Sequence, residues 1–136
     1  MTTTNYINTF IAVADDCPVL AAEVPVMKGD KPTAATLQFE MIKNHPYKYD
    51  SDSIIFQVYA EKNEITKSSL REEREKFFSK GQACLRASPL TKRYGWGVHS
   101  NADGKVAIFA LESREYEAFL KNKSLKQVKA MRSNKK

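Results

Sequence analysis

The clearest structural signal in the chain is the run Tyr94-Gly-Trp-Gly-Val-His-Ser-Asn-Ala-Asp-Gly-Lys-Val-Ala-Ile-Phe-Ala-Leu111. Its two halves, 94–100 and 105–111, are rich in the aromatic and β-branched residues that favour strands. Asn101-Ala-Asp-Gly104 lies between them and is a turn sequence. The stretch therefore predicts a β-hairpin, from which the rest of the fold can be worked out.

The length of the hairpin loop decides which residues share a face, because side chains alternate along a strand. A loop of two or four residues gives one face of mostly large apolar side chains: Trp96, Val98, Ala107, Phe109 and Leu111. The opposite face then holds Gly95, Gly97, His99, Val106, Ile108 and Ala110. In this arrangement Trp96 belongs to the core, and His99 lies on the glycine face.

Gly95 and Gly97 occupy alternate positions of the first predicted strand. Glycine inside a strand gives up side-chain packing and usually marks a place where another group approaches the backbone closely. A helix, a crossing strand or a ligand would each satisfy this pattern. The sequence leaves these three alternatives open.

The remaining elements follow from periodicity and from capping residues. Further strands are predicted at 6–13, at 54–60 and, as a short buried piece, at 82–87. Helices are predicted at 34–44 after an N-cap at Thr33, at 69–80 after a capping box at Ser69, and from Ser113, with Tyr116, Phe119 and Leu120 inward. Ser124-Leu-Lys-Gln127 predicts a final helical turn. The expected fold class is α+β: a mainly antiparallel sheet of four to five strands, with three to four helices packed on one side and at an edge.

Length and composition indicate one globular domain. The chain has 136 residues and 42% apolar residues, so we expect a single domain over 1–136 with disordered ends at 1–5 and 133–136. The first thirty residues lack the basic start, long apolar run and small-residue cleavage site of a secretory signal, so we expect none. No apolar run approaches the roughly 18 residues that would suggest a membrane span. The two cysteines, Cys17 and Cys84, fit a reducing compartment. We therefore expect a soluble, cytoplasmic protein without membrane contact.

The net charge of +6 is concentrated at the C-terminal end. From Lys121 onward the chain carries six lysines and Arg132 and no acidic residue, so the rest of the chain is close to neutral. Such a basic segment can contact nucleic acid, although many only keep a protein soluble. Nucleic-acid binding by the C-terminal segment is therefore one alternative.

The run Gln82–Leu90, followed by Tyr94-Gly-Trp-Gly97 and His99, resembles a small, uncharacterised microbial family known only as a domain of unknown function. The similarity extends to residues 8–11, 16–18, 46–47, 112–113 and 129–133, and so covers nearly the whole chain. The resemblance implies a stand-alone intracellular protein and suggests that 129–133 belongs to the fold. It implies no activity, cofactor or catalytic residue.

The segment around the hairpin combines cations, hydroxyls and aromatic rings that suit an anionic small molecule. The candidate ligand-binding residues are Arg86, Ser88, Lys92, Arg93, Tyr94 and His99. The function that we expect is a small module that binds an anionic small molecule near residues 86–99. The sequence names no cofactor for it.

Three alternatives remain beside this expectation. Cys84 with a histidine, His45 or His99, meets the minimal requirement of a cysteine-dependent enzyme, although the apolar neighbours of Cys84 favour a structural role. Single-stranded nucleic acid could use the same basic and aromatic residues. A homodimer could form by pairing of sheet edges. No two cysteine or histidine residues have chelating spacing, so we expect no metal site.

Overall fold

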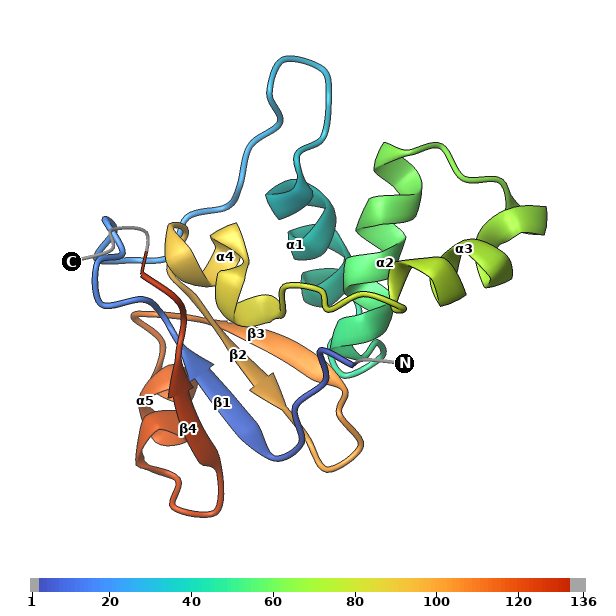
Figure 1. Ribbon diagram of the computed structural model, residues 1–136. Helices are drawn as coiled ribbons and strands as arrows, with labels where there is room; N and C mark the ends of the chain where they lie inside the picture. The colour runs from blue at the N-terminus through green and yellow to red at the C-terminus, as the bar shows by residue number, and fades with distance from the viewer. Residues whose placement is uncertain (1–2, 133–136) are drawn as a thin grey trace.

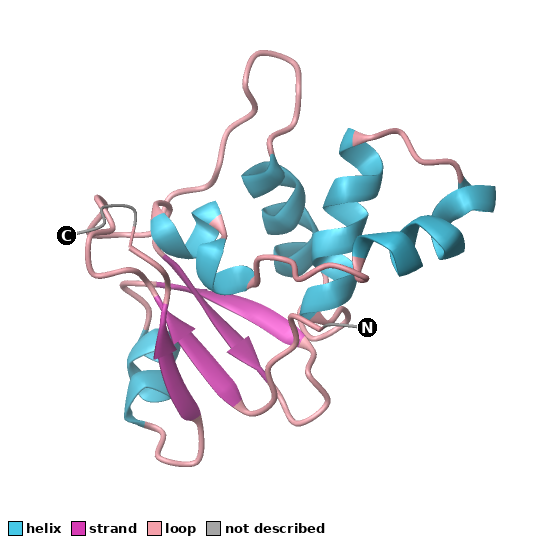
Figure 2. Cartoon of the chain, in the orientation of Figure 1, coloured by secondary structure: helices cyan, strands magenta, loops and turns pink. Residues whose placement is uncertain are grey.

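A computed structural model describes residues 3–132 (Figures 1 and 2). The elements in chain order are β1 (Thr9–Ala12), α1 (Ala34–Asn44), α2 (Ser51–Lys62), η1 (Lys67–Ser69), α3 (Leu70–Phe77), η2 (Leu85–Ala87), α4 (Pro89–Lys92), β2 (Trp96–Ser100), β3 (Val106–Ala110), α5 (Arg114–Lys121) and β4 (Lys126–Lys129). The expected α+β class is confirmed.

The four strands form one mixed sheet in the order β3-β2-β1-β4. β1 pairs antiparallel with β2, and β2 pairs antiparallel with β3. β4 runs parallel to β1, with Ile11 opposite Val128. The sheet is therefore antiparallel in two of its three pairings, and the first strand of the chain lies inside it.

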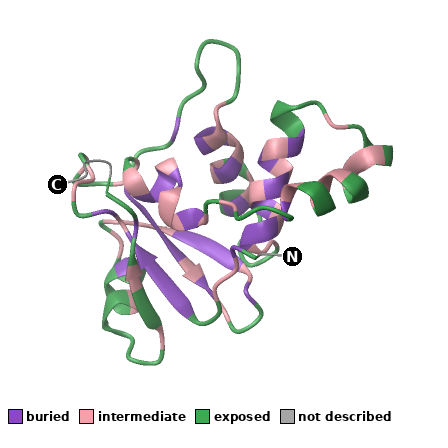
Figure 3. Cartoon of the chain, viewed as in Figure 1, coloured by how far each residue is buried: buried purple, intermediate pink, exposed green. Residues whose placement is uncertain are grey.

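Helices cover both faces of the sheet, so the prediction that they pack on one side and at an edge is wrong. The main core joins α1, α2 and α4 to one face and contains Ile42, Ile54, Leu90, Trp96 and Val98. A second core joins α5 to the other face through Phe10, Ala12 and Tyr116. The burial of the two inner strands, β1 and β2, in Figure 3 follows from this double cover, whereas the edge strand β4 is mostly exposed.

The predicted hairpin is confirmed, but its predicted pairing of faces is wrong. Asn101 N donates to Lys105 O, so three residues, 102–104, form the loop between them, with Gly104 at φ +77°. An odd loop shifts the register by one residue, and Trp96 lies opposite Ala110. Trp96 and Val98 therefore share their face with Val106, Ile108 and Ala110, whereas Gly97 and His99 lie with Ala107 and Phe109.

The predicted strand at 54–60 is wrong, because these residues belong to α2. The side chain of Asp50 accepts a hydrogen bond from Ser53 N at 2.8 Å and starts this helix. Ile54 packs in the main core, whereas Phe56 and Ala60 pack with Phe78 in a third cluster. A helix that is buried on more than one side can have buried residues at alternate positions, as a strand does. This alternation in α2 explains why the sequence predicted a strand.

Two other predicted elements change type. Residues 82–87 do not form a strand: Leu85–Ala87 is a short 3-10 helix, and Ser88 then caps α4. Residues 126–129 form a strand rather than a helical turn, because they pair with β1. The helix predicted at 69–80 is the shorter α3, and Ser69 makes no capping hydrogen bond through its side chain.

The helices α1 and α5 are confirmed together with their caps. The side chains of Thr33 and Ser113 accept hydrogen bonds from the backbone N–H groups of Thr36 and Tyr116. Leu120 was predicted to face inward, but it is 44% exposed. The inward face of α5 consists of Tyr116 and Phe119 alone.

Residues 3–5, which were expected to be frayed, bind the start of α2. Thr4 N and Thr4 Oγ1 each donate to Asp52 Oδ1 at 2.7 Å, and Thr3 Oγ1 donates to Asp52 Oδ2 at 2.6 Å. Asp52 is 3% exposed. The other expected disordered residues, 1–2 and 133–136, lie outside the described part of the chain.

Candidate functional site

Arg86 and Ser88, two of the predicted ligand-binding residues, make hydrogen bonds within the fold. Arg86 Nε donates to Lys129 O at 2.6 Å, and Arg86 O accepts from Met131 N at 2.8 Å. Ser88 is buried, donates to Gln38 Oε1 and accepts from Leu90 N. These contacts fix the C-terminal segment and the start of α4.

Lys92 is the last residue of α4, and Arg93 and Tyr94 come directly after this helix. Arg93 is exposed, and the side chain of Tyr94 packs against the main core. The backbone carbonyl of Tyr94 accepts from Glu23 N at 2.8 Å and so holds the long loop between β1 and α1. The three residues are neighbours in the chain, but only Tyr94 has a clear packing role.

His99 lies on the α5 face of the sheet, away from the α4 face where Ser88 is buried. Its Nδ1 lies 2.8 Å from the hydroxyl of Tyr47, and its ring stacks on Phe119 with 4.4 Å between the centroids. Burial lowers the pKa of His99 below its ordinary value. The structure therefore does not bring His99 together with the other predicted ligand residues.

Both strand glycines are approached by protein groups, which decides among the alternatives that the sequence left open. A Cβ atom on Gly97 would lie 2.6 Å from Phe10 Cζ and 2.6 Å from Tyr116 Cε2, so helix α5 fills this face. A Cβ atom on Gly95 would lie 2.8 Å from Val19 Cγ2, in the loop before α1. Gly95 also has φ +82°, a conformation that favours glycine.

The group near Cys84 is a tyrosine. Tyr6 Oη lies 3.7 Å from Cys84 Sγ, and no histidine within residues 3–132 hydrogen-bonds to this thiol. Both cysteines are free thiols. Within the described residues, no group of three or more histidine, cysteine, aspartate or glutamate side chains is placed to hold a metal ion.

A groove that the sequence did not indicate opens between α1, α2 and α3. It has a volume of about 440 Å³ and is lined by Met41, Tyr49, Ser53, Phe56, Gln57, Leu70, Arg71 and Arg74. We call it the arginine groove. Apolar and aromatic side chains form most of its wall, and two guanidinium groups three residues apart on α3 supply its charge.

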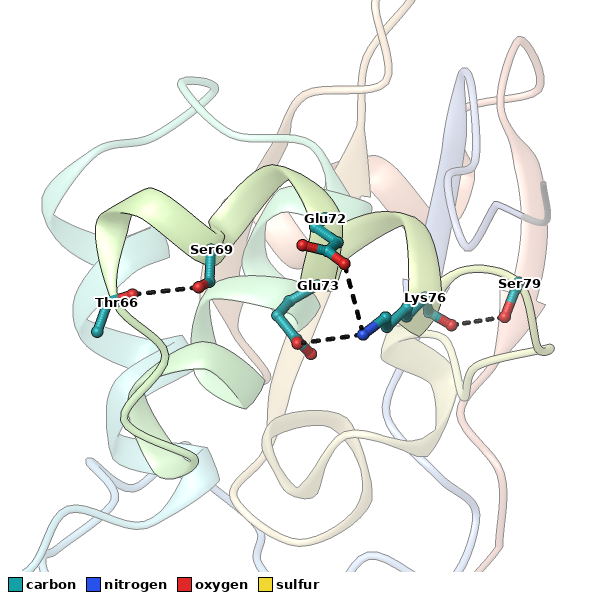
Figure 4. Close-up of polar contacts among 6 residues, drawn as sticks. All are labelled: Thr66, Ser69, Glu72, Glu73, Lys76 and Ser79. Atoms are coloured by element: carbon teal, nitrogen blue, oxygen red, sulfur yellow. Dashed lines mark hydrogen bonds and ion pairs between the residues drawn. The ribbon is translucent and has the colours of Figure 1, made fainter.

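The two arginines of the groove have no acidic partner within residues 3–132. The carboxylates of Glu72 and Glu73 instead approach Lys76, at 3.7 and 3.8 Å (Figure 4). The guanidinium carbon of Arg74 lies 5.9 Å from the ring centroid of Phe56 and 5.5 Å from that of Phe78. Cation–π contacts of this kind hold a guanidinium in place while leaving its N–H donors available.

The sequence contained a partial signal for this groove. The spacing of Arg71 and Arg74 places both on one side of a helix, beside Leu70. The many charges of this helix are equally typical of a solvated outer face. The other walls come from α1 and α2, and α2 had been predicted as a strand, so the groove could not be assembled from the sequence.

The fold and the groove together define a small α+β domain with one four-stranded mixed sheet and an apolar groove that carries two arginines. The chain belongs to a family of unknown function, DUF6157, whose model matches residues 1–136. This match confirms the family resemblance expected from the sequence. No curated protein and no solved structure matches the chain. No helix within residues 3–132 is long and apolar enough to cross a membrane.

Proposed function

We propose that the protein is a binding module for small amphiphilic anions and that the arginine groove is its binding site. The observation that carries this proposal is the pair Arg71 and Arg74, which have no carboxylate partner among residues 3–132 and lie at an apolar groove of about 440 Å³. This volume lies within the range of about 300–1,000 Å³ typical of small-molecule sites. The class of ligand is the one expected from the sequence, an anionic small molecule, but the proposed site is the arginine groove instead of residues 86–99.

The groove suits a ligand with two unlike ends. A carboxylate or phosphate can accept several N–H donors from the two guanidinium groups, since such charge-assisted hydrogen bonds are the strong ones. Met41, Tyr49, Phe56 and Leu70 offer an apolar wall for the rest of the ligand. Ser53 and Gln57 add neutral polar groups for orientation.

The test compares phenyl phosphate and phenylacetate with uncharged benzyl alcohol by calorimetric titration and thermal unfolding. We expect the two anions to bind and to raise the melting temperature, and benzyl alcohol to do neither. Arg71→Gln with Arg74→Gln should weaken anion binding by at least about tenfold, because hydrogen bonds to charged groups contribute about 1.5–3 kcal/mol each.

Two control variants test whether the anions bind in the arginine groove or at another basic residue. Arg114→Gln, at the exposed start of α5, should bind the anions as the parent protein does. Arg93→Gln probes the site that the sequence favoured. Loss of binding in Arg93→Gln, with the groove variant unaffected, would return the site to residues 86–99. If neither anion binds, the proposal is contradicted.

The nucleic-acid alternative remains a prediction. Two lysines of the basic C-terminal segment pair with acids: Lys121 with Glu117 at 3.7 Å and Lys129 with Asp15 at 2.9 Å. Both pairs are exposed and leave the lysines accessible to phosphate. Binding to short single strands that weakens steeply with salt would support this alternative.

A further inference from the structure

A second groove, separate from the arginine groove, runs along one edge of the sheet. It has a volume of about 300 Å³, and its lining includes four consecutive residues of β3, 107–110. Neighbouring side chains of a strand point to opposite faces, so a groove lined by four residues in a row follows the backbone of the strand. β3 lies at the end of the strand order, with β2 as its neighbour. We call this groove the edge groove.

The hydrogen bonds at the two ends of the hairpin show which residues of β3 bond to β2. Asn101 N donates to Lys105 O at 2.9 Å, and Leu111 N donates to Gly95 O at 2.9 Å. Hydrogen-bonded pairs recur at every second residue of an antiparallel ladder. The odd-numbered residues of β3 therefore bond to β2, and the even-numbered residues direct their N–H and C=O groups to the outer edge.

Three backbone groups on this outer edge are open. Val106 N donates to Tyr49 O at 2.9 Å, and Val106 O accepts from Tyr47 N at 2.8 Å, so the start of the edge already has partners. In the described part of the chain, no group outside the sheet hydrogen-bonds to Ile108 or to the N–H of Ala110. The N–H and C=O of Ile108 and the N–H of Ala110 are therefore available to an added strand.

The open part of the edge is short. Tyr47 and Tyr49 cover Val106 at one end, and at the other end the chain turns at Ser113, whose N–H donates to Ala110 O at 2.9 Å. A second copy of this chain would bring the same two obstructions to the same edge. A single extended peptide brings only its own backbone, so a peptide fits the open part better than another sheet does.

The two walls of the edge groove differ in chemistry. On the side of the main core, Ile42 and Trp96 offer apolar surface, and Lys43 Nζ lies 5.5 Å from the centroid of the Trp96 ring. On the side of α5, the lining includes Glu115, which is exposed and forms no ion pair within the described residues. An added strand therefore meets apolar side chains with one face and a carboxylate with the other.

We propose that the edge groove binds an extended peptide segment of a partner protein, which adds to β3 as an antiparallel strand. The peptide residue opposite Ile108 exchanges two backbone hydrogen bonds with it, and the residue opposite Ala110 accepts from Ala110 N. Both of these peptide side chains share the face of Ile108 and contact the apolar wall. The residue between them lies on the α5 face, where a lysine or arginine meets Glu115. The partner segment thus has the pattern apolar, basic, apolar.

The probe is the capped peptide acetyl-Thr-Val-Lys-Val-Thr-amide, and nuclear magnetic resonance titration of the full chain is the measurement. We expect the amide signals of Ile108 and Ala110 to shift and their hydrogen exchange to slow. N-methylation of the second valine removes the N–H that donates to Ile108 O, and should weaken binding by at least about tenfold. N-methylation of the lysine is the matched control, because this N–H faces away from β3, and binding should be retained.

Glu115→Gln tests the preference for a basic residue. The parent protein should bind the peptide more tightly than a version with glutamate in place of lysine, and Glu115→Gln should lose this preference. Glu117→Gln, one turn-position away on the exposed side of α5, should keep it. The proposal is overturned if the signals of Ile108 and Ala110 do not shift, if the peptide methylated at the second valine binds equally well, or if the preference survives Glu115→Gln. Signals of Ile108 that depend on protein concentration without peptide would assign the edge to a second copy, and would also overturn it.

Discussion

At the scale of single residues, Gly97 lies where an added methyl group has no room. Phe10 is fully buried beside it, and Tyr116 is held by the hydrogen bond that its hydroxyl accepts from Val13 N at 3.0 Å. We predict that Gly97→Ala lowers the free energy of unfolding by about 1–3 kcal/mol or more, because overpacking forces the neighbouring rings to move. Urea unfolding measures this loss.

Gly81 is the matched control. Nothing lies within 4 Å of a Cβ atom built there, and its φ is not in the positive range. Gly81→Ala should be neutral or should stabilise the protein by up to about 1 kcal/mol, since alanine restricts the unfolded chain. Equal losses in the two variants would mean that crowding under α5 is not what requires glycine at 97.

His99 predicts a dependence of stability on pH. Its pKa is lowered by burial in the folded protein, and it is about 6.5 in the unfolded chain. The unfolded state therefore binds more protons below pH 6.5, and stability falls as the pH falls through 6.5 toward the folded pKa. We expect the melting temperature to drop between pH 7 and pH 5, and to drop less in His99→Gln.

His45 provides the comparison for this pH effect. It is exposed at the end of α1, where its ring lies 5.9 Å from that of Tyr49. His45→Gln should keep the pH dependence of the parent protein. Carboxyl groups titrate near pH 4 and contribute mainly below this range. If His99→Gln shows the full drop, the buried imidazole is not its source.

At the scale of elements, α2 is the helix on which the arginine groove depends. Ser53, Phe56 and Gln57 line the groove, whereas Ile55, Val58 and Tyr59 line a separate cavity beside Cys84. Ile54 meanwhile packs against the sheet in the main core. The helix thus has a different neighbour on each side, which explains why its sequence shows no single apolar stripe.

The N-terminal segment stabilises this helix through Asp52. Asp52→Ala leaves the backbone N–H of the buried Thr4 without its acceptor, whereas the Thr4 hydroxyl keeps Ser51 Oγ as a partner at 2.8 Å. We predict a loss of at least about 1 kcal/mol in the free energy of unfolding, since an unsatisfied buried group costs about 1–3 kcal/mol. Thermal unfolding measures the loss, and amide exchange at Thr4 should become faster.

Asp103 is the comparison for Asp52. It is an exposed aspartate in the hairpin loop, where its backbone N–H rather than its carboxylate is bonded, to Asn101 Oδ1 at 3.0 Å. Asp103→Ala should change stability by less than about 0.5 kcal/mol. A loss in Asp52→Ala that does not exceed this value would show that residues 3–4 do not stabilise α2.

The sequence predicted those elements whose signals are local. The cap at Thr33 and the turn at 101–104 are read from neighbouring residues, and both elements formed where expected. α2 and β4 could not be predicted, because their type depends on partners far along the chain: Phe78 for α2 and β1 for β4. The arginine groove requires α2 as a helix, so the groove could not be derived from the sequence.

At the scale of the whole molecule, the C-terminal segment completes the sheet. β4 pairs with β1 from Lys126 to Lys129, Leu125 packs in the second core, and Ala130 is buried in the main core. We predict that a variant ending at residue 124 does not fold cooperatively. A variant ending at residue 132 keeps the contacts described above and should unfold like the parent protein. Circular dichroism during thermal unfolding compares the two.

The place of β1 has a consequence for synthesis of the protein. β1 is made first, but its neighbours in the sheet are β2 and β4, and Ile11 pairs with Val98 and Val128. At about 5–20 residues per second, the ribosome needs on the order of ten seconds to make the chain between β1 and β4, and β4 then still has to leave its exit tunnel. Until then the edge of β1 that pairs with β4 has no partner strand. The nascent chain therefore exposes an open edge of an apolar strand, and the sheet is complete only once β4 has emerged.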